Sequence, residues 1–186
     1  MFLFLINDIK GYQNKWIVAD SAEPKSNEYR RKLDSLGEDD KTTRLIYKNI
    51  KEILSLKDST QNEGLCFIFS DSQTDLKNTN SIKARQIGMS KKMKNALECS
   101  KPNTIIGIHN HLGSSLPSYS DLMAASKRKY KYGLIACHNG DIIKYKVDNE
   151  INITKRLYES WLKDFSENIN ELNRKLQNRG VQIWKL

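Results

Sequence analysis

Hydrophobic residues recur along this chain with two different periods, and each change of period predicts a change of element. Between residues 41 and 56 apolar side chains return every three or four positions, which predicts an amphipathic helix. The segments 64–69 and 104–108 are short and apolar almost throughout, and the second is rich in β-branched residues. Both are therefore predicted to be buried strands.

A hairpin is expected further along the chain. The segments 133–137 and 141–147 have strand character, and Asn139-Gly140 between them is a strong hairpin signal. Pro102 ends the helix that precedes the strand at 104–108, because proline cannot continue a helix. The remaining expected elements are strands at 2–6 and 15–19, helices at 26–33, 86–98 and 118–129, and a polar hairpin or loop at 71–81.

The C-terminal part carries one long apolar stripe. Its members recur at steps of four and three, which predicts an amphipathic helix that packs on the core, docks a partner or self-associates: Leu157, Trp161, Phe165, Ile169, Leu172 and Leu176. Gly180 follows as a C-cap, and a strand-like Val-Gln-Ile-Trp comes next. The stripe alone does not distinguish the three roles.

Helices and strands alternate along the chain, which predicts an α/β or α+β fold with a mixed sheet. We expect three parts. Residues 1–57 form an N-terminal strand and helix extension, residues 58–150 form the central domain, and residues 151–186 form a C-terminal amphipathic helix and tail.

Composition narrows the class of protein. The chain has 186 residues, 38% hydrophobic and 28% charged, and no apolar run is long enough to span a membrane, so we expect a cytoplasmic globular protein. Its three cysteines are widely spaced, which argues against a disulfide framework or a thiolate zinc cage. The net charge of +9 fits either an anionic partner, such as nucleic acid, or a lysine-rich surface.

The chemistry gathers between residues 104 and 121. His109 and His111 follow an apolar strand at positions i and i+2, so their imidazoles point to the same face and can bind one metal ion. A glycine- and serine-rich turn then leads to a helix that starts at Ser118, with Asp121 in its first turn. Two histidines and one carboxylate leave a fourth position open, which is typical of a catalytic zinc site.

Two of these residues have a second interpretation. Ser118 and Asp121 also fit a capping box, which is the usual explanation of a Ser-x-x-Asp helix start. A hydrolytic site needs a general base, and Glu63, just before the strand at 64–69, can serve if that strand lies beside 104–108. Otherwise Glu63 is a solvated acid next to a strand.

These residues together resemble the JAMM motif of the JAB/MPN metallopeptidase family, over about residues 58–147. The resemblance implies a cytidine-deaminase-like fold with a mixed central sheet flanked by helices. It also implies roles for five residues. His109, His111 and Asp121 match the zinc ligands, Glu63 matches the glutamate that deprotonates the water, and Ser118 matches the serine that helps to stabilise the oxyanion.

The chain departs from the family at two points. Leu112 stands where many members have proline, and the loop between His111 and Ser118 is one residue shorter than in the eukaryotic isopeptidases. Residues 108–145 look most like the JAB-type domains attached to phage minor head proteins, which share the shorter loop. Residues 17–26 resemble a segment of phage large terminase subunits, which agrees with a phage or prophage origin.

Three functions follow as expectations. The first is a zinc-dependent JAMM-type peptidase or isopeptidase that acts on a protein or peptide substrate through a metal-activated water. The second is a non-enzymatic JAB-like module that assembles with phage structural proteins or DNA. The third is metal-dependent chemistry on nucleic acid, as suggested by the similarity to the RadC-like proteins and by the positive charge. The basic run at 127–132 is either a solvated helix end or a phosphate-binding segment.

Overall fold

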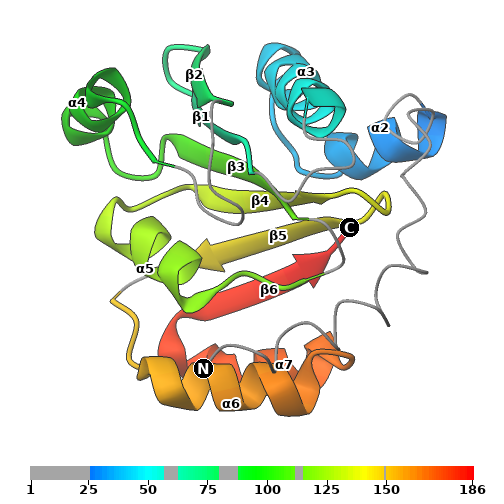
Figure 1. Cartoon of the computed structure of the whole chain (residues 1–186), viewed down its shortest axis with the longest axis vertical. Helices are drawn as coiled ribbons and strands as arrows, with labels where there is room; N and C mark the ends of the chain where they lie inside the picture. The colour runs from blue at the N-terminus through cyan, green and yellow to red at the C-terminus, as the bar shows by residue number, and fades with distance from the viewer. Residues whose placement is uncertain (1–25, 57–62, 80–87, 112–114, 149) are drawn as a thin grey trace, which may run out of the picture.

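The structure is a computed structural model that describes residues 26–56, 63–79, 88–111, 115–148 and 150–186. A six-stranded sheet lies between two layers of helices (Figure 1). The strands are β1 (Leu65–Phe69), β2 (Thr74–Asn78), β3 (Ile105–His111), β4 (Tyr132–Cys137), β5 (Ile142–Val147) and β6 (Val181–Lys185). The helices are α2 (Asn27–Asp34), α3 (Asp40–Leu56), α4 (Lys91–Cys99), α5 (Tyr119–Lys127), α6 (Lys155–Phe165) and α7 (Ile169–Leu176), followed by the 3₁₀ turn η2 (Gln177–Arg179).

The sheet is mixed, as the alternation of elements predicts. Its strand order is β2-β1-β3-β4-β5-β6, and β3 and β4 are parallel while every other neighbouring pair is antiparallel. The predicted hairpin between β4 and β5 is present, and Gly140 in its turn has a φ of 86°, which glycine adopts without strain. The strands expected at 2–6 and 15–19, and the terminase-like segment except its last residue, lie outside the described residues.

Each face of the sheet has its own hydrophobic core. On one face α2 and α3 pack against β1, β3 and β4, with Ile46, Ile50 and Ile53 of α3 fully buried. The predicted helix at 41–56 is therefore present, and its apolar stripe covers the sheet. On the other face α4, α5, α6 and α7 cover the strands, and Figure 1 shows α6 and α7 on the side opposite α3. The central strands are apolar on both sides for this reason.

The C-terminal stripe forms two helices rather than the single helix that its spacing predicts. The chain breaks between α6 and α7, where the Asn168 side chain accepts a hydrogen bond from the Glu171 N–H at 3.1 Å and so caps the second helix. In α6 the buried side chain is Tyr158, whereas Leu157 is 38% exposed. Leu172 and Leu176 of α7 are fully buried, so this half of the stripe packs on the core.

The end of the chain belongs to the sheet. Strand β6 pairs with β5 from Val181 to Lys185, and the side chains of Val181 and Ile183 are fully buried. Residues 151–186, expected as a helix and tail, therefore supply both a strand of the central sheet and part of its core. The polar segment expected at 71–81 likewise contains β2, which forms a hairpin with β1.

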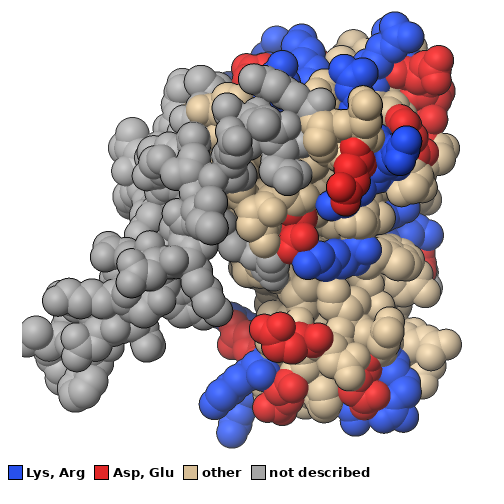
Figure 2. All heavy atoms as spheres, turned by 90° about the vertical axis from the view of Figure 1, so that its right-hand side faces the viewer, with Lys and Arg blue, Asp and Glu red and all other residues tan. Residues whose placement is uncertain are grey.

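Charged side chains of both signs cover the surface. On the face drawn in Figure 2, lysines and arginines are interspersed with aspartates and glutamates rather than gathered in one patch. Some of them form ion pairs across elements, such as Lys131 with Glu38 at 2.7 Å and Lys185 with Asp141 at 2.7 Å. Within the described ranges, no helix has the length and apolar character that crossing a membrane requires.

Candidate metal centre

Strand β3 carries the two histidines at its C-terminal end. His109 and His111 point to the same face of the sheet, because side chains two positions apart on a strand share a face. Strand β3 is an interior strand, with Leu65 of β1 opposite His109 on one side and Ile135 of β4 on the other. His109 is consequently buried, while His111 at the strand end is half-buried.

Helix α5 brings the carboxylate. Ser118 is its N-cap, and its hydroxyl oxygen accepts a hydrogen bond from the Asp121 N–H at 3.2 Å. Asp121 Oδ2 in turn accepts hydrogen bonds from the N–H and the hydroxyl of Ser118, both at 2.7 Å. The capping box that the sequence suggests is therefore present, and it locks the Asp121 side chain at the start of the helix.

The three side chains converge on one point. His109 Nε2 lies 3.1 Å from His111 Nε2 and 3.7 Å from Asp121 Oδ2, and the three donor atoms lie within 4.8 Å of one another. Two ligands of a tetrahedral zinc ion are about 3.3 Å apart, given zinc–nitrogen distances of about 2.0–2.1 Å. The two separations measured from His109 Nε2 are close to this edge length. In the described part of the chain, no other trio of His, Cys, Asp or Glu is grouped in this way.

A serine orients the second histidine. His111 Nδ1 lies 3.2 Å from the carbonyl oxygen of Ser115 and 2.7 Å from its hydroxyl oxygen. In the tautomer with its hydrogen on Nδ1, that nitrogen donates to the carbonyl oxygen of Ser115, which can only accept, and Nε2 keeps its lone pair. That lone pair faces Nε2 of His109, and a proton on His109 or a cation between the two rings makes the contact attractive. Such an outer partner is typical of histidines that bind metals.

Glu63 reaches the same site from the neighbouring strand. Strands β1 and β3 are antiparallel with Leu65 opposite His109, so the register continued by two residues places Glu63 across from His111. Glu63, Leu65 and Phe67 alternate onto one face, and all three line a cleft that also contains His109, His111, Ser118 and Asp121. The pairing of strands on which the proposed role of Glu63 depends is therefore present.

Asn110 fixes the backbone beside Glu63. Its side-chain oxygen accepts a hydrogen bond of 2.6 Å from the Gly64 N–H, and this N–H belongs to the peptide unit that joins Glu63 to Gly64. The Asn110 amide nitrogen lies 3.1 Å from Nε2 of His138. A Cβ atom on Gly64 would lie 2.8 Å from Cγ2 of Ile53, so α3 presses on the backbone at this point. Asn110 is 1% exposed, on the face of β3 opposite the histidines.

The cleft has a volume of about 670 Å³, and aromatic rings form part of its lining. Two glycines make room for these rings. A Cβ atom on Gly107 would lie 2.8 Å from Cε2 of Tyr130, and one on Gly133 would lie 2.0 Å from Cζ of Tyr145. Gly107 and Gly133 are neighbours across the parallel β3–β4 pair, so the two rings pack against adjacent positions of the sheet backbone.

Burial controls the ionisation of these tyrosines. It raises the pKa of Tyr130 and that of Tyr145 above the ordinary value, and the nearby Asp121 carboxylate raises both further. The Arg128 guanidinium opposes this effect on the pKa of Tyr130. Both phenols are therefore neutral at physiological pH, and they can donate hydrogen bonds in the cleft.

The sequence interpretation did not identify Asn110, Ser115 or Arg128 as site residues. Strand alternation predicts that Asn110 faces away from the two histidines. It does not predict the hydrogen bond between the Asn110 side chain and the Gly64 N–H. His138 lies in the turn after β4. Its backbone N–H also donates to the carbonyl oxygen of His111 at 3.2 Å, a contact between strands that spacing does not encode.

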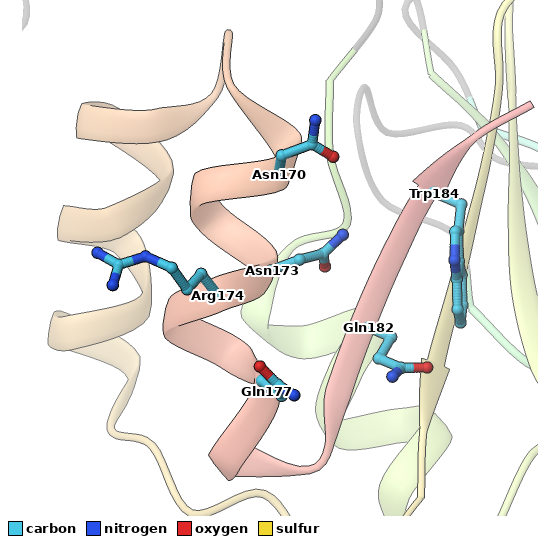
Figure 3. A pocket seen from close by; sticks show the side chains of 6 residues that line it. All are labelled: Asn170, Asn173, Arg174, Gln177, Gln182 and Trp184. Carbon is cyan, nitrogen blue, oxygen red and sulfur yellow. The ribbon is translucent and has the colours of Figure 1, made fainter.

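A second hollow, of about 280 Å³, lies between α7 and β6 (Figure 3). The residues that line it in the described part of the chain include no His, Cys, Asp or Glu: Asn170, Asn173, Arg174, Gln177, Gln182 and Trp184. The Asn173 amide bonds both the N–H and the carbonyl of Ile183, at 2.9 and 2.6 Å. Asn173 therefore satisfies backbone groups of the edge strand β6, and the residues that line this hollow offer no metal ligands.

Comparisons with known proteins do not assign a family. No family model matches the chain, and no curated protein or solved structure is significantly similar to it. The function is therefore argued from the geometry of the site.

Proposed function

We propose that this chain is a zinc-dependent amide hydrolase of the JAB/MPN type, a peptidase or isopeptidase with a JAMM-like centre. One observation carries the proposal. The donor atoms of His109, His111 and Asp121 lie within 4.8 Å of one another, with His109 Nε2 3.1 Å from His111 Nε2 and 3.7 Å from Asp121 Oδ2, in a cleft that also contains Glu63. Two nitrogen donors and one oxygen donor suit zinc, although the set is not specific to that metal.

The chemistry of the residues follows from their places. His109, His111 and Asp121 would hold the zinc ion, which would supply a water molecule of lowered pKa and polarise the amide carbonyl. Glu63, across from His111 in the same cleft, would accept the proton of that water and later return it to the leaving amine. Gly64 and Asn110 hold the backbone of Glu63 in this position.

Ser118 has two roles in the proposal. Its hydroxyl donates to Asp121 Oδ2 and so orients the carboxylate that faces His109. The same hydroxyl lines the cleft and stabilises the oxyanion of the amide when it rotates away from Asp121. The hydroxyl has one hydrogen, so it serves one of these acceptors at a time.

The first test is metal content. Purified wild-type protein is expected to contain about one zinc per chain, and His111→Ala is expected to lose it because only two ligands remain. His138→Gln is the matched control, since it removes the third histidine of the chain without touching the triad. Equal zinc in wild type and His111→Ala would show that the triad does not hold the ion.

The second test is hydrolysis. Glu63→Gln keeps the size of the side chain and removes its basicity, so we expect the rate to fall by about 10²- to 10⁴-fold with zinc retained. The exposed Glu98→Gln on α4 is the control. The substrates are a panel of linear peptides and lysine isopeptides. Full activity in Glu63→Gln rules out the proposed base, and zinc without hydrolysis of any amide favours the non-enzymatic assembly module.

A further inference from the structure

Arg128 lies in the same cleft, at the other end of α5 from Asp121. The lining residues of this helix include Asp121, Ala124 and Arg128, which recur at steps of three and four and therefore share one face. Asp121 and Arg128 are seven positions apart, which is two helical turns, so their Cα atoms are about 10.5 Å apart along the helix axis. The cleft thus has the proposed metal centre at one end of α5 and an arginine at the other.

Arg128 differs from the basic residues around it. Lys127 and Lys129 are exposed, and Lys131 pairs with Glu38 on the other side of the sheet. Arg128 is half-buried, and none of the ion pairs within the described ranges of the chain includes it. Its guanidinium lies near the Tyr130 hydroxyl and lowers the pKa of that phenol, against the larger effect of burial. The run at 127–132 is therefore not a uniform solvated helix end, since one of its cations lines the cleft.

The charges of the cleft favour an anion. Its described lining residues include two acids, Glu63 and Asp121, and one permanent cation, Arg128. A divalent cation held by the triad would offset the two carboxylates and leave the charge of Arg128 in excess. A positive cleft attracts anionic groups, and the whole chain, at +9, adds to that attraction.

We propose that Arg128 binds a carboxylate of the substrate, so that the amide hydrolysed at the metal centre belongs to an acidic peptide. This inference rests on the proposed function of the same cleft. The planar guanidinium binds a carboxylate through two parallel hydrogen bonds. An extended peptide advances about 3.3–3.6 Å per residue, so the 10.5 Å along α5 places the acidic residue about three residues from the scissile amide. Leu65 and Phe67 line the cleft as apolar contacts for neighbouring side chains.

Matched peptide pairs test the inference. Each pair has Glu or Gln two, three or four residues from the scissile bond, on either side of it. Zinc-loaded wild type is expected to prefer one Glu peptide over its Gln partner by about tenfold to a hundredfold in kcat/KM, the size of one charge-assisted interaction. Arg128→Gln is expected to bring this ratio to about one, and Arg128→Glu to favour a Lys peptide instead. Lys127→Gln is the control, because Lys127 is exposed and does not line the cleft.

A binding measurement separates this inference from the proposed function. The same labelled peptides are titrated with zinc-loaded Glu63→Gln and with Glu63→Gln/Arg128→Gln, and fluorescence anisotropy gives Kd. Tighter binding of a Glu peptide that depends on Arg128, without hydrolysis by wild type, supports the inference and contradicts the hydrolase. If Glu and Gln peptides are hydrolysed or bound equally well, the inference is overturned. If they are hydrolysed equally well, the proposed function still stands.

Discussion

At the scale of single residues, Asp121 combines a structural role with a proposed role as a metal ligand. Its Oδ2 atom accepts two hydrogen bonds from Ser118 and faces Nε2 of His109 at 3.7 Å. The capping box and the proposed metal ligand are therefore compatible, because the cap itself holds the carboxylate beside His109. His111 is held in a similar way, because Ser115 contacts its Nδ1 while its Nε2 faces Nε2 of His109.

Asn110 gives a prediction at this scale. Asn110→Leu keeps the approximate volume but leaves the Gly64 N–H without its acceptor, so Gly64 is expected to exchange its amide hydrogen faster and stability to fall by about 1–3 kcal/mol. Zinc content is expected to stay unchanged, because the triad is intact, while amide hydrolysis falls as Glu63 loses its fixed backbone. Hydrogen exchange measured by NMR, metal analysis and a rate assay check the three effects.

Asn95→Leu is the matched control for this prediction, since Asn95 is exposed on α4. Unchanged exchange at Gly64 in Asn110→Leu would mean that another group holds this peptide unit.

At the scale of elements, the parallel pair β3–β4 shapes the cleft. Gly107 and Gly133 are register partners, and the rings of Tyr130 and Tyr145 occupy the space that their side chains would fill. Glycine is usually unfavourable inside a strand. Here the loss is offset by two large aromatic groups that pack close to the backbone, next to the proposed ligands.

Gly133→Ala tests this packing. The new Cβ would lie 2.0 Å from Cζ of Tyr145, whose ring is buried and cannot move into solvent, so we expect a loss of about 1–3 kcal/mol in the free energy of unfolding. Gly88→Ala is the control, because its Cβ would meet nothing within 4 Å. Equal urea midpoints for the two variants would contradict the close packing of Tyr145.

At the scale of the whole molecule, segments near both ends of the described chain pack on or pair with the same sheet. Helices α2 and α3 cover one face, while β6, near the C-terminus, pairs with β5 and buries Val181 and Ile183 against the other core. Asn173 bonds the outer edge of β6 at Ile183, so a side chain occupies backbone groups that an unprotected edge strand offers to other chains (Figure 3).

Deletion of residues 181–186 tests the role of β6. It removes a row of sheet hydrogen bonds and two fully buried side chains, so we expect a loss of at least about 3 kcal/mol and a protein that unfolds at a lower temperature or aggregates through β5. Trp184→Ala, at a position 36% exposed, is expected to change the unfolding temperature less. An unchanged transition in the deletion variant would show that β6 is dispensable.

Much of the local structure could be predicted from the sequence. The amphipathic helix at 41–56, the hairpin at Asn139-Gly140 and the capping box at Ser118 all depend on residues a few positions apart. The break between α6 and α7 could not be predicted from the apolar stripe, because the apolar spacing continues across Asn168. The side chain of Asn168 caps α7, so a new helix starts there. Alternation along β3 likewise predicted that His109 and His111 share a face, because strand periodicity is a local property.

The sequence by itself therefore determined which residues are grouped on one strand or one helix turn: the histidine pair, and Asp121 beside Ser118. Only the tertiary structure decided that Glu63 and Arg128 meet this group in one cleft. The physical reason is that these two residues reach the site through the register of β1 on β3 and through the packing of α5 on the sheet. Such contacts between distant segments depend on the whole core, which no short pattern of residues encodes.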